Sequence, residues 1–484
     1  MTNSSDNAVY GDESPIAAFA TTPGNSALTL IRCSGKGSIE LVSSVFAAAR
    51  TKNNSLQENI SPLMTASGNT VIHGWIVSKT EGTAVDKIDD VLISVFRAPK
   101  SYTGQDSLDI CCHGGITAGK AVMAALKGAG FRDALPGEFT FRAFINGKLD
   151  LTKAESVMEL VSAKTETSRR HAVSRLSGSL YNEIDAIKKL LVDVLAAAEI
   201  YLDYSEDEIS ADTEEAEGKL PQKNNALEAL TRLKKLSASW QLERILQEGI
   251  TIVIAGCPNS GKSSLFNALL KEDRSIVTEI PGTTRDWIEA WVSIEGIPIR
   301  LIDTAGLRET GDSVEKIGVE RSRKLLEESD IVLYLIDGAL GLTAEDKDFT
   351  ANLNRHILVW NKCDIAPLPE SLHVSGQFPI SVSAKTGEGL TELYAAITSA
   401  VGIKDLQLHN DTSSAALGTI RQKNLVDAAC TSLEEAITLS DNNEPLDIIA
   451  PLLKDAVNSL GEITGEVSTA DILEKMFSTF CVGK

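Results

Sequence analysis

Eight residues near the middle of the chain have the types and spacing of a phosphate-binding loop. Residues 256–263 read GCPNSGKS, which fits the pattern G-x-x-x-x-G-K-[S/T]. Glycines let the backbone curl so that successive N–H groups point at phosphate oxygens. Lys262 would reach the β- and γ-phosphates of a nucleotide, and the Ser263 hydroxyl would bind Mg²⁺. An apolar, β-branched run at 250–255 precedes the loop and a helical run from Ser264 follows it, so the sequence predicts a P-loop between a strand and a helix.

Three further motifs follow, each at the end of a short apolar segment. Residues 303–306, DTAG, supply an Asp303 that would hold Mg²⁺ through water and a Gly306 whose N–H would sense the γ-phosphate. Residues 361–364, NKCD, end in a carboxylate that can accept both N1–H and the exocyclic amine of guanine, a pair of donors that adenine lacks. Residues 383–385, SAK, would close over the base. Because ligands bind at the carboxyl ends of strands in open α/β sheets, the four motifs predict a GTP site.

The residue after the DTAG motif bears on how a water molecule is activated. Many GTPases carry Gln there to orient the attacking water, whereas this chain has Leu307, which cannot do so. Glu309 and Glu315 lie in the acidic loop that follows; either could act as the base, or these charges merely solvate the loop. No arginine finger is evident. A monovalent cation could replace its charge, and the Asn259 side chain offers a carbonyl toward the phosphates.

Length and composition place this site within a larger globular chain. Its 484 residues exceed one domain, so about two to four domains are expected. A hydrophobic content of 43% is enough for ordinary cores, and no apolar run approaches the roughly 18 residues of a membrane span. The polar, acidic N-terminus lacks a secretory signal, and the seven cysteines form no C-x-x-C pair. A reducing cytoplasm is the expected location.

The net charge of −21 bears on nucleic-acid binding. Nucleic-acid binders usually have a basic balance, because they neutralise phosphates. Any RNA contact of this chain must therefore use a local basic patch or a basic partner protein. Charge alone favours an acidic enzyme without RNA contact.

The period of the apolar residues divides the chain into three regions. Residues 14–137 alternate short apolar runs with turns, which is typical of an α+β fold. Helical spacing dominates 151–247 and returns after residue 401, on either side of the GTPase motifs. The sequence predicts a multidomain protein with an α+β N-terminal domain, a discontinuous α-helical domain and an inserted α/β P-loop GTPase domain.

A cysteine, Cys481, stands three residues before the end of the chain, in the segment FCVGK. A cysteine this close to a terminus is usually an incidental exposed thiol. Placed after an aromatic residue and before Val, Gly and a terminal Lys, it could instead be delivered into a site on a mobile tail. Both interpretations stay open from the residues alone.

Motifs along nearly the whole chain resemble those of the MnmE (TrmE) family of tRNA-modifying GTPases. Besides the GTPase motifs, the resemblance rests on TPG at 22–24, SYTGQD at 101–106, HGG at 113–115, LPGEFT at 135–140, RAFINGKLDL at 142–151 and FCVGK at 480–484. It implies a folate-binding and dimerising N-terminal domain over 1–137, with 1–14 disordered, a helical domain over 138–247 and 403–484 that ends in the Cys motif, and a GTPase domain over 248–402.

The resemblance also implies an activity. Members of this family hydrolyse GTP and, with an FAD-dependent flavoprotein of the MnmG type, add a carboxymethylaminomethyl group at C5 of the wobble uridine of certain tRNAs, using formyl-tetrahydrofolate. A homodimer that forms a heterotetramer with the flavoprotein is implied. The alternative is a ribosome-assembly GTPase or regulatory switch of the Era or Der type, which would carry a basic RNA-binding domain.

Individual residues acquire roles from the same resemblance. Glu315 matches the catalytic glutamate, and Cys481 is a candidate residue of the tRNA modification. Asp109 stands where the family generally has Glu. The implied ligands are Asn259, Thr278, Ile280 and Thr283 for K⁺, Ser263 and Thr284 for Mg²⁺, and Arg32, Asp109, Lys148 and Lys484 for the folate.

The residues expected to contact GTP come from the P-loop, the first switch segment and the three later motifs. Thr284 is the natural Mg²⁺ ligand of the switch segment. The full set is Asn259, Ser260, Gly261, Lys262, Ser263, Ser264, Thr278, Thr283, Thr284, Asp303, Thr304, Ala305, Gly306, Asn361, Lys362, Asp364, Ser383, Ala384 and Lys385.

Overall fold

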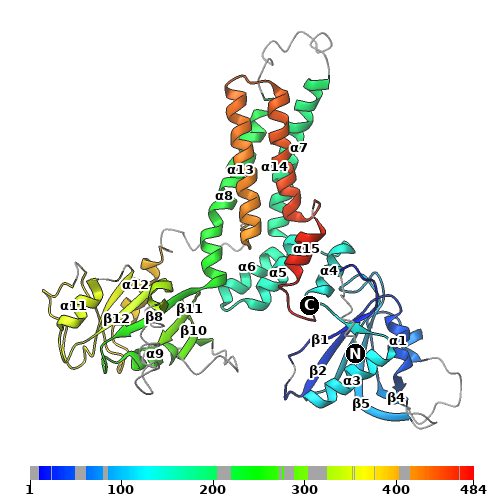
Figure 1. Ribbon diagram of the computed structural model, residues 1–484, viewed down its shortest axis with the longest axis horizontal. Helices are drawn as coiled ribbons and strands as arrows, with labels where there is room; N and C mark the ends of the chain where they lie inside the picture. The colour runs from blue at the N-terminus through cyan, green and yellow to red at the C-terminus, as the bar shows by residue number, and fades with distance from the viewer. Residues whose placement is uncertain are drawn as a thin grey trace, which may run out of the picture. The chain divides into compact units, whose positions relative to one another are not determined.

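The chain folds into two compact units, Met1–Met158 with Leu460–Lys484, and Glu159–Ser459. Their elements can be followed in the computed structural model of Figure 1. The structure describes residues 10–22, 24–49, 61–79, 85–203, 220–271, 275–276, 288–303, 324–351, 353, 355–374, 377–402, 415–467 and 469–483.

The first unit is built on a seven-stranded, mostly antiparallel sheet. Alternation along its strands buries one set of side chains, such as Ile31, Ile93 and Ile110, beneath the helices that cover that face. In spatial order the strands are β3 (Phe46–Ala48), β4 (Thr70–Lys79), β5 (Val85–Phe96), β6 (Ser107–His113), β2 (Leu28–Ser34), β1 (Ile16–Phe19) and β7 (Arg132–Asp133).

The helices of the first unit come from both ends of its sequence. Helix α3 packs on the sheet, whereas α15, from the C-terminal part of the chain, packs against α4. Phe477 on α15 is fully buried with Leu151 and Phe480 in one apolar cluster. The helices are α1 (Ser38–Ser44), α2 (Pro62–Thr65), α3 (Ile116–Ala129), α4 (Glu138–Ile145) and α15 (Ala470–Phe477).

The N-terminal extension is shorter than the sequence predicts. Residues 10–14 were expected to be disordered, but the structure places them: the Tyr10 hydroxyl donates to the Pro136 carbonyl at 2.6 Å, and Arg132 Nε donates to Asp12 at 3.1 Å and to Ser14 at 2.7 Å. Their side chains find partners far along the chain, a pairing that a local reading of composition does not detect. Residues 1–9 lie outside the described part of the chain.

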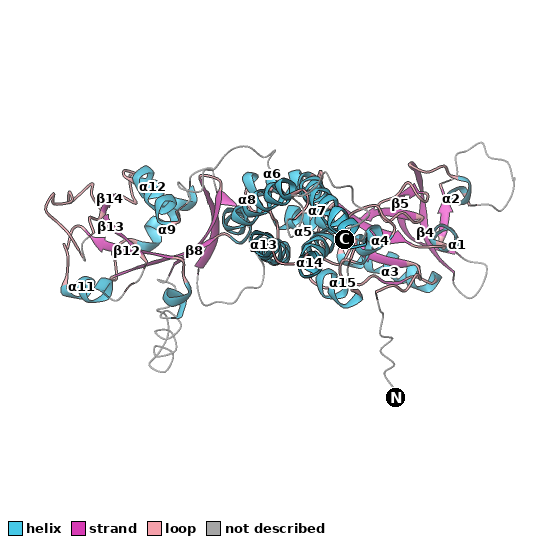
Figure 2. Cartoon of the chain, turned by 90° about the horizontal axis from the view of Figure 1, so that it is seen from above, coloured by secondary structure: helices cyan, strands magenta, loops and turns pink. Residues whose placement is uncertain are grey.

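A bundle of long helices connects the N-terminal sheet to the GTPase motifs in sequence. In Figures 1 and 2 the helices α7, α8, α13 and α14 run side by side, with α13 and α7 each packed on α8. Apolar residues at helical spacing, such as Ile184, Ile187 and Leu191, are fully buried between them. The bounds are α5 (Leu151–Ser162), α6 (Glu166–Leu176), α7 (Ser179–Asp203), α8 (Lys223–Glu248), α13 (Ile420–Asp441) and α14 (Leu446–Thr464).

A buried ionic cluster lies where the GTPase segment leaves and rejoins this bundle. The Arg175 guanidinium, 2% exposed, donates to Glu159 at 2.7 Å and to Glu243 at 2.8 Å, and His171 also contacts Glu243. Burial opposes ionisation of Glu243, yet the hydrogen bond from His171 and the charge of Arg175 lower its pKa. Gly418 packs so closely that a Cβ there would lie 2.0 Å from Glu159 Oε1. The cluster therefore joins α5, α6 and α8 to the returning chain.

The GTPase segment forms an open α/β sheet with parallel strands at its centre. Strand β8 lies between β11 and β12, parallel to both, so that its carboxyl end adjoins theirs. The strands, in spatial order, are β14 (Ile380–Val382), β13 (His356–Asn361), β12 (Ile331–Asp337), β8 (Ile250–Gly256), β11 (Ile297–Asp303), β10 (Ile288–Ile294) and β9 (Ser275–Ile276), and the helices are α9 (Lys262–Lys271), α11 (Ala344–Ala351) and α12 (Leu390–Ala400).

The expected fold class is confirmed: an α+β region, helices on either side of the GTPase segment, and an inserted α/β P-loop fold. The division at residues 137, 247 and 402 stays a prediction. Within the described ranges, every helix is too short or too polar to cross a lipid bilayer.

Candidate nucleotide site

Positive φ angles shape the loop between β8 and α9. Gly256 and Gly261 have φ of +143° and +97°, and Asn259, which is exposed, has φ of +63°. A Cβ on Gly261 would lie 2.2 Å from Asn361 Nδ2, so no other residue fits there. These backbone conformations fit the predicted phosphate cradle, in which a phosphate would meet backbone N–H groups and the start of α9.

Lys262 lies at the first position of α9 and curls back over the loop. Its Nζ donates to the carbonyl oxygens of Gly256 at 2.9 Å and of Cys257 at 2.8 Å. These contacts hold the ammonium group above the cradle. A positive charge held there fits the polyphosphate of a nucleotide.

Two oxygen ligands for a cation meet next to the cradle. The Ser263 hydroxyl donates to Asp303 Oδ2 at 2.7 Å, and Asp303 is fully buried at the end of β11. Strand pairing brings them together, because Asp303 is in register with Ile254 of β8, which leads into the loop. Hydroxyl and carboxylate oxygens are ligands that Mg²⁺ prefers, so this donor set fits the predicted metal.

The base-binding motifs are tied to each other and to the loop. Ser383 Oγ donates to Asp364 at 2.7 Å and so orients its carboxylate. Asn361 accepts from Ala384 N at 3.1 Å and donates to the Ser260 carbonyl at 2.7 Å. The guanine-reading Asp364 thus stands in a fixed place relative to the phosphate cradle. Ser264 and Lys385 are exposed beside these motifs.

Asp337 is a site residue that the sequence analysis missed. Lys362 of the NKCD motif, with φ of +69°, donates to Asp337 Oδ2 at 2.6 Å, and Asp337 is 6% exposed. Asp337 ends the fully buried strand β12. An acidic residue at the end of such a run, between the DTAG and NKCD strands, was the signal that could have found it.

Several predicted residues cannot be placed. Both switch segments and the end of the tail lie outside the described part of the chain. The predictions concerned are Thr278, Ile280, Thr283, Thr284, Thr304, Ala305, Gly306, Glu309, Glu315 and Lys484.

A second polar site lies on the N-terminal sheet. Arg32 of β2 stands opposite Asp109 of β6, and two hydrogen bonds of 3.0 and 3.3 Å join them. The Arg32 guanidinium also lies 5.8 Å from the ring centre of Tyr102 and 6.0 Å from that of Phe139. A cation between aromatic rings, with a carboxylate beside it, could hold a flat heterocycle that carries acidic groups.

Lys148, a further predicted folate residue that the structure describes, lies beside the loop that carries Tyr102. Lys148 Nζ donates to the Pro99 carbonyl at 3.1 Å, and its Cγ would lie 3.4 Å from a Cβ on Gly104. The hydroxyl groups of Tyr102, two residues from Gly104, and Thr140 share a hydrogen bond of 3.0 Å. The segment 101–106 therefore connects Arg32 to Lys148.

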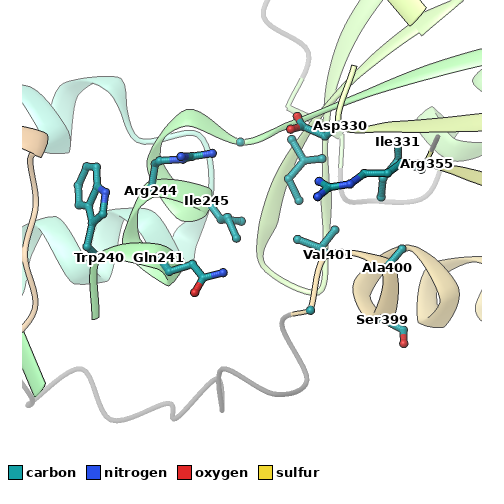
Figure 3. A pocket seen from close by; sticks show the side chains of 13 residues that line it. Trp240, Gln241, Arg244, Ile245, Asp330, Ile331, Arg355, Ser399, Ala400 and Val401 are labelled. Carbon is teal, nitrogen blue, oxygen red and sulfur yellow. The ribbon is translucent and has the colours of Figure 1, made fainter. Parts of the chain in front are cut away.

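A cavity of about 500 Å³ lies in the second unit, away from the nucleotide loops. Figure 3 shows Trp240 and Arg244 of α8 on one side and Asp330, Arg355 and Val401 on the other. It borders the amino ends of β8, β12 and β13, the edge of the sheet opposite the nucleotide loops. None of the predicted site residues that the structure describes lines it.

Comparison with known proteins places these sites in a family. A family model described as the GTP-binding protein TrmE N-terminus matches residues 15–148, and one described as the MnmE helical domain matches residues 151–481. A tRNA modification GTPase MnmE of Treponema denticola is 41% identical over 98% of this chain and 99% of its own length. The chain belongs to the MnmE family. Another MnmE, from Carboxydothermus hydrogenoformans, is 39% identical over 98% of this chain and 100% of its own length.

Solved structures match over smaller parts of the chain. Era in complex with MgGDPNP and nucleotides of 16S ribosomal RNA is 30% identical over 31% of this chain and 56% of its own, with a TM-score of 0.26. The G domain of the T. maritima FeoB iron transporter is 29% identical over 31% of this chain and 98% of its own, with a TM-score of 0.24. Membership of the MnmE family, which extends over the N-terminal and helical regions, excludes the alternative of an Era- or Der-type protein.

The Lys362–Asp337 pair gives a testable prediction. Asp337→Ala should weaken GTP and GDP binding about equally, by roughly tenfold, because Lys362 loses the charge-assisted bond that fixes the base motif. Nucleotide Kd values from fluorescent-analogue titration measure this. The control is Glu289→Ala, which breaks the pair with Arg300 on β10 and β11 and should leave both Kd values unchanged. Loss of GTP binding with GDP binding intact would contradict the assignment, because it would indicate a γ-phosphate sensor.

Proposed function

We propose that this protein is a GTP-hydrolysing enzyme that, with an FAD-dependent flavoprotein of the MnmG type, adds a carboxymethylaminomethyl group at C5 of the wobble uridine of certain tRNAs. The observation that carries the proposal is the likeness to tRNA modification GTPases along nearly the whole chain, combined with a nucleotide site whose described residues fit GTP. Seven free thiols support a reducing cytoplasm as its location.

The described residues divide the work of binding GTP. Lys262 and the loop amides hold the phosphates, and Asp364 accepts the two donors of guanine. Ser263 and Thr284 would bind Mg²⁺, with Asp303 holding it through water, and the ion would supply charge that neutralises the phosphate oxygens. The hydrogen bonds of Asn361 and Ser383 hold the motif that contains Asp364 in place. Asp364 favours GTP over ATP because adenine lacks the pair of donors that its carboxylate accepts.

We assign the activation of water to Glu315. We assign to K⁺ the positive charge that an arginine finger would otherwise supply. Leu307 cannot orient a water, so a carboxylate from the second switch segment is needed. Asn259, exposed on the loop, is one K⁺ ligand; Thr278, Ile280 and Thr283 of the first switch segment are the others. Such a ligand shell is complete only when that segment closes over the nucleotide.

Formyl-tetrahydrofolate is the proposed one-carbon donor of the N-terminal domain. Asp109 would accept from the polar edge of the pterin, which can stack on Tyr102, while Arg32, Lys148 and Lys484 would neutralise the acidic tail. Burial raises the pKa of Tyr102, which keeps the ring neutral. The pairing of Arg32 with Asp109 across two strands fixes the site before the ligand arrives.

The proposed homodimer uses the sheet face that carries this pair. The strand registers place Val71 and Leu92 on the same face as Arg32 and Asp109. Val71 is 62% exposed and Leu92 48%, and Leu28, on the same face, is 57% exposed. Apolar side chains gathered next to a ligand site suit a second copy of the chain, with the folate held beside the interface.

Because the net charge is −21, the tRNA is expected to be held largely by the flavoprotein partner, with this chain supplying GTP hydrolysis and the one-carbon unit. A complex of two copies of each protein follows from the dimer. Cys481 remains the candidate thiol of the modification.

Reconstitution tests the function. The protein, the flavoprotein, tRNA, GTP and formyl-tetrahydrofolate should together yield the modified uridine, detected by nucleoside mass spectrometry, and omission of GTP or folate should abolish it. Arg32→Ala should weaken folate binding at least tenfold, since a charge-assisted bond contributes about 1.5–3 kcal/mol. Lys127→Ala, which removes an exposed charge of the same unit, is the control. Modification that proceeds without folate would contradict the proposed donor.

The cation proposal has its own test. GTP hydrolysis should be much faster in KCl than in NaCl at equal ionic strength, because Na⁺ is too small for a shell of carbonyl oxygens built around K⁺. Asn259→Ala should abolish the difference and leave GTP binding intact. Glu315→Ala should slow hydrolysis by about 10²-fold or more in either salt. Equal wild-type rates in both salts would rule out a role for K⁺, and loss in Glu309→Ala alone would move the base to Glu309.

A further inference from the structure

The P-loop motif leaves the residue after its first glycine open, and this chain has Cys257 there. The Cys257 thiol is partly buried and donates to Asp346 Oδ1 at 3.3 Å. At neutral pH a thiol, whose ordinary pKa is about 8.5, carries its proton and can act as the donor. A side chain therefore ties the loop that would meet the phosphates to Asp346 of α11, a residue outside the four GTPase motifs.

Asp346 is a buried carboxylate with no direct part in the proposed binding of GTP. It is 2% exposed, and both of its oxygens accept hydrogen bonds. Thr343 donates from its N–H at 2.9 Å and from its hydroxyl at 2.8 Å, and the Tyr334 hydroxyl donates at 2.8 Å to the oxygen that Cys257 contacts. Burial opposes ionisation of Asp346, yet these hydrogen bonds, first that of the Thr343 N–H, lower its pKa. The thiol thus meets a charged acceptor.

Helix α11 and strand β12 hold this carboxylate in place. The Thr343 hydroxyl also accepts from the Asp346 N–H at 3.2 Å, so that the two residues form a capping box at the start of α11. The ring of Tyr334, on β12, stacks on Phe349 of α11 with ring centres 5.1 Å apart. Because β12 pairs in parallel with β8, which leads into Cys257, the phenol and the thiol approach the same oxygen from neighbouring segments.

The carbonyl group of Cys257 orients Lys262. Lys262 Nζ donates to that carbonyl at 2.8 Å, and Ser260 N donates to it at 3.3 Å. Lys262 Nζ also donates to the Gly256 carbonyl at 2.9 Å, and Gly256 packs so closely on β12 that a Cβ there would lie 2.4 Å from the Leu335 carbonyl oxygen. Packing therefore fixes Gly256, and the bond to Asp346 restrains Cys257. A rotation of residue 257 would move one of the two carbonyl groups that hold the ammonium group.

We propose that Cys257 and Asp346 are positioning residues for Lys262. The hydrogen bond between thiol and carboxylate holds the Cys257 carbonyl where it directs the ammonium group toward the β- and γ-phosphates. This orientation matters most in the transition state, where charge develops on the phosphate oxygens. The role rests on the GTP hydrolysis of the proposed function and requires neither tRNA nor folate. The hydrogen bond rests on the structure alone, so the bond and the role call for separate measurements.

Infrared spectroscopy of the full-length protein tests the hydrogen bond. The S–H stretching band of Cys257 is the difference between the spectra of wild-type protein and Cys257→Ala. In Asp346→Asn, whose side chain has nearly the same shape, the band is obtained against the double variant that also carries Cys257→Ala. It should lie at higher frequency there, because a neutral amide is a weaker acceptor than a carboxylate. A band at the same frequency in both pairs would overturn the bond.

Steady-state GTP hydrolysis in KCl tests the positioning role. Cys257→Ala should lower kcat by about tenfold and change KM for GTP by less than about threefold, since a misplacement of about 1 Å can cost about 10²-fold and a loosened loop shifts less. Cys257→Ser, which restores a donor at the same position, should recover most of the lost rate. Wild-type kcat in Cys257→Ala would overturn the role.

Tyr334→Phe is the matched control. It removes a different donor from the same carboxylate oxygen and leaves the bond of Cys257, so it should lower the free energy of unfolding and leave kcat unchanged. Equal loss of kcat in Tyr334→Phe and Cys257→Ala would overturn the positioning role, because the network would then act through stability alone. If wild-type protein did not hydrolyse GTP, the proposed function and this role would both fail, while the infrared band would still decide the bond.

Discussion

The buried ion pairs of Arg175 hold together the helices between which the GTPase segment leaves and rejoins the bundle. The chain leaves the bundle and returns to it near this cluster: Glu243 lies six residues before Gly249, and Gly418, just before α13, packs against Glu159. Removal of one partner of such a buried pair destabilises a protein by about 3–5 kcal/mol, because the other charge is left buried without a counter-charge. The helices that border the GTPase segment are therefore fixed to one another by buried charges, and Lys164 Nζ, between α5 and α6, lies 3.4 Å from the ring centre of Trp291 on β10.

The nucleotide site depends on a second constraint, the parallel pairing of β11, β8, β12 and β13. Their carboxyl ends adjoin, so residues from motifs as distant as Ser260 and Asn361 come within 2.7 Å of each other. Helix α9, which follows the loop, adds the partial positive charge of its N-terminus and the charge of Lys262. The nucleotide site belongs to one unit of the chain, and the polar site around Arg32 belongs to the other.

The sequence alone predicts the strands and helices that depend on a local pattern of residues. The strand before the P-loop, expected at 250–255, is Ile250–Gly256, and the helical spacing expected over 151–247 ends with α8, Lys223–Glu248. The helical spacing expected from residue 151 onward is interrupted between α5 and α6, where Thr165 caps α6 by accepting from Ser168 N at 3.1 Å. A Thr within a helical pattern does not by itself indicate that one helix ends and another begins.

What sequence could not supply is long-range pairing. Lys362 is recognisable from its motif, but its partner Asp337 is identified only by the neighbouring strand end. Likewise, the family resemblance indicated Arg32 and Asp109 separately, and their direct pairing comes from the register of β2 with β6 across 77 residues. The hydrogen bond from Gly137 N to the Cys481 carbonyl joins segments more than 340 residues apart by sequence number, which no local pattern indicates.

The central claim is that guanine-nucleotide hydrolysis at this site drives modification of tRNA. The most direct measurement exchanges the base that the site reads. Asp364→Asn replaces the acceptor for the guanine amine by an amide that can donate to the C2 carbonyl of xanthine. In the reconstituted reaction, this variant should modify tRNA with xanthosine triphosphate and no longer with GTP, while wild-type protein shows the reverse. Modification by the variant that is unaffected by which nucleotide is supplied would contradict the account.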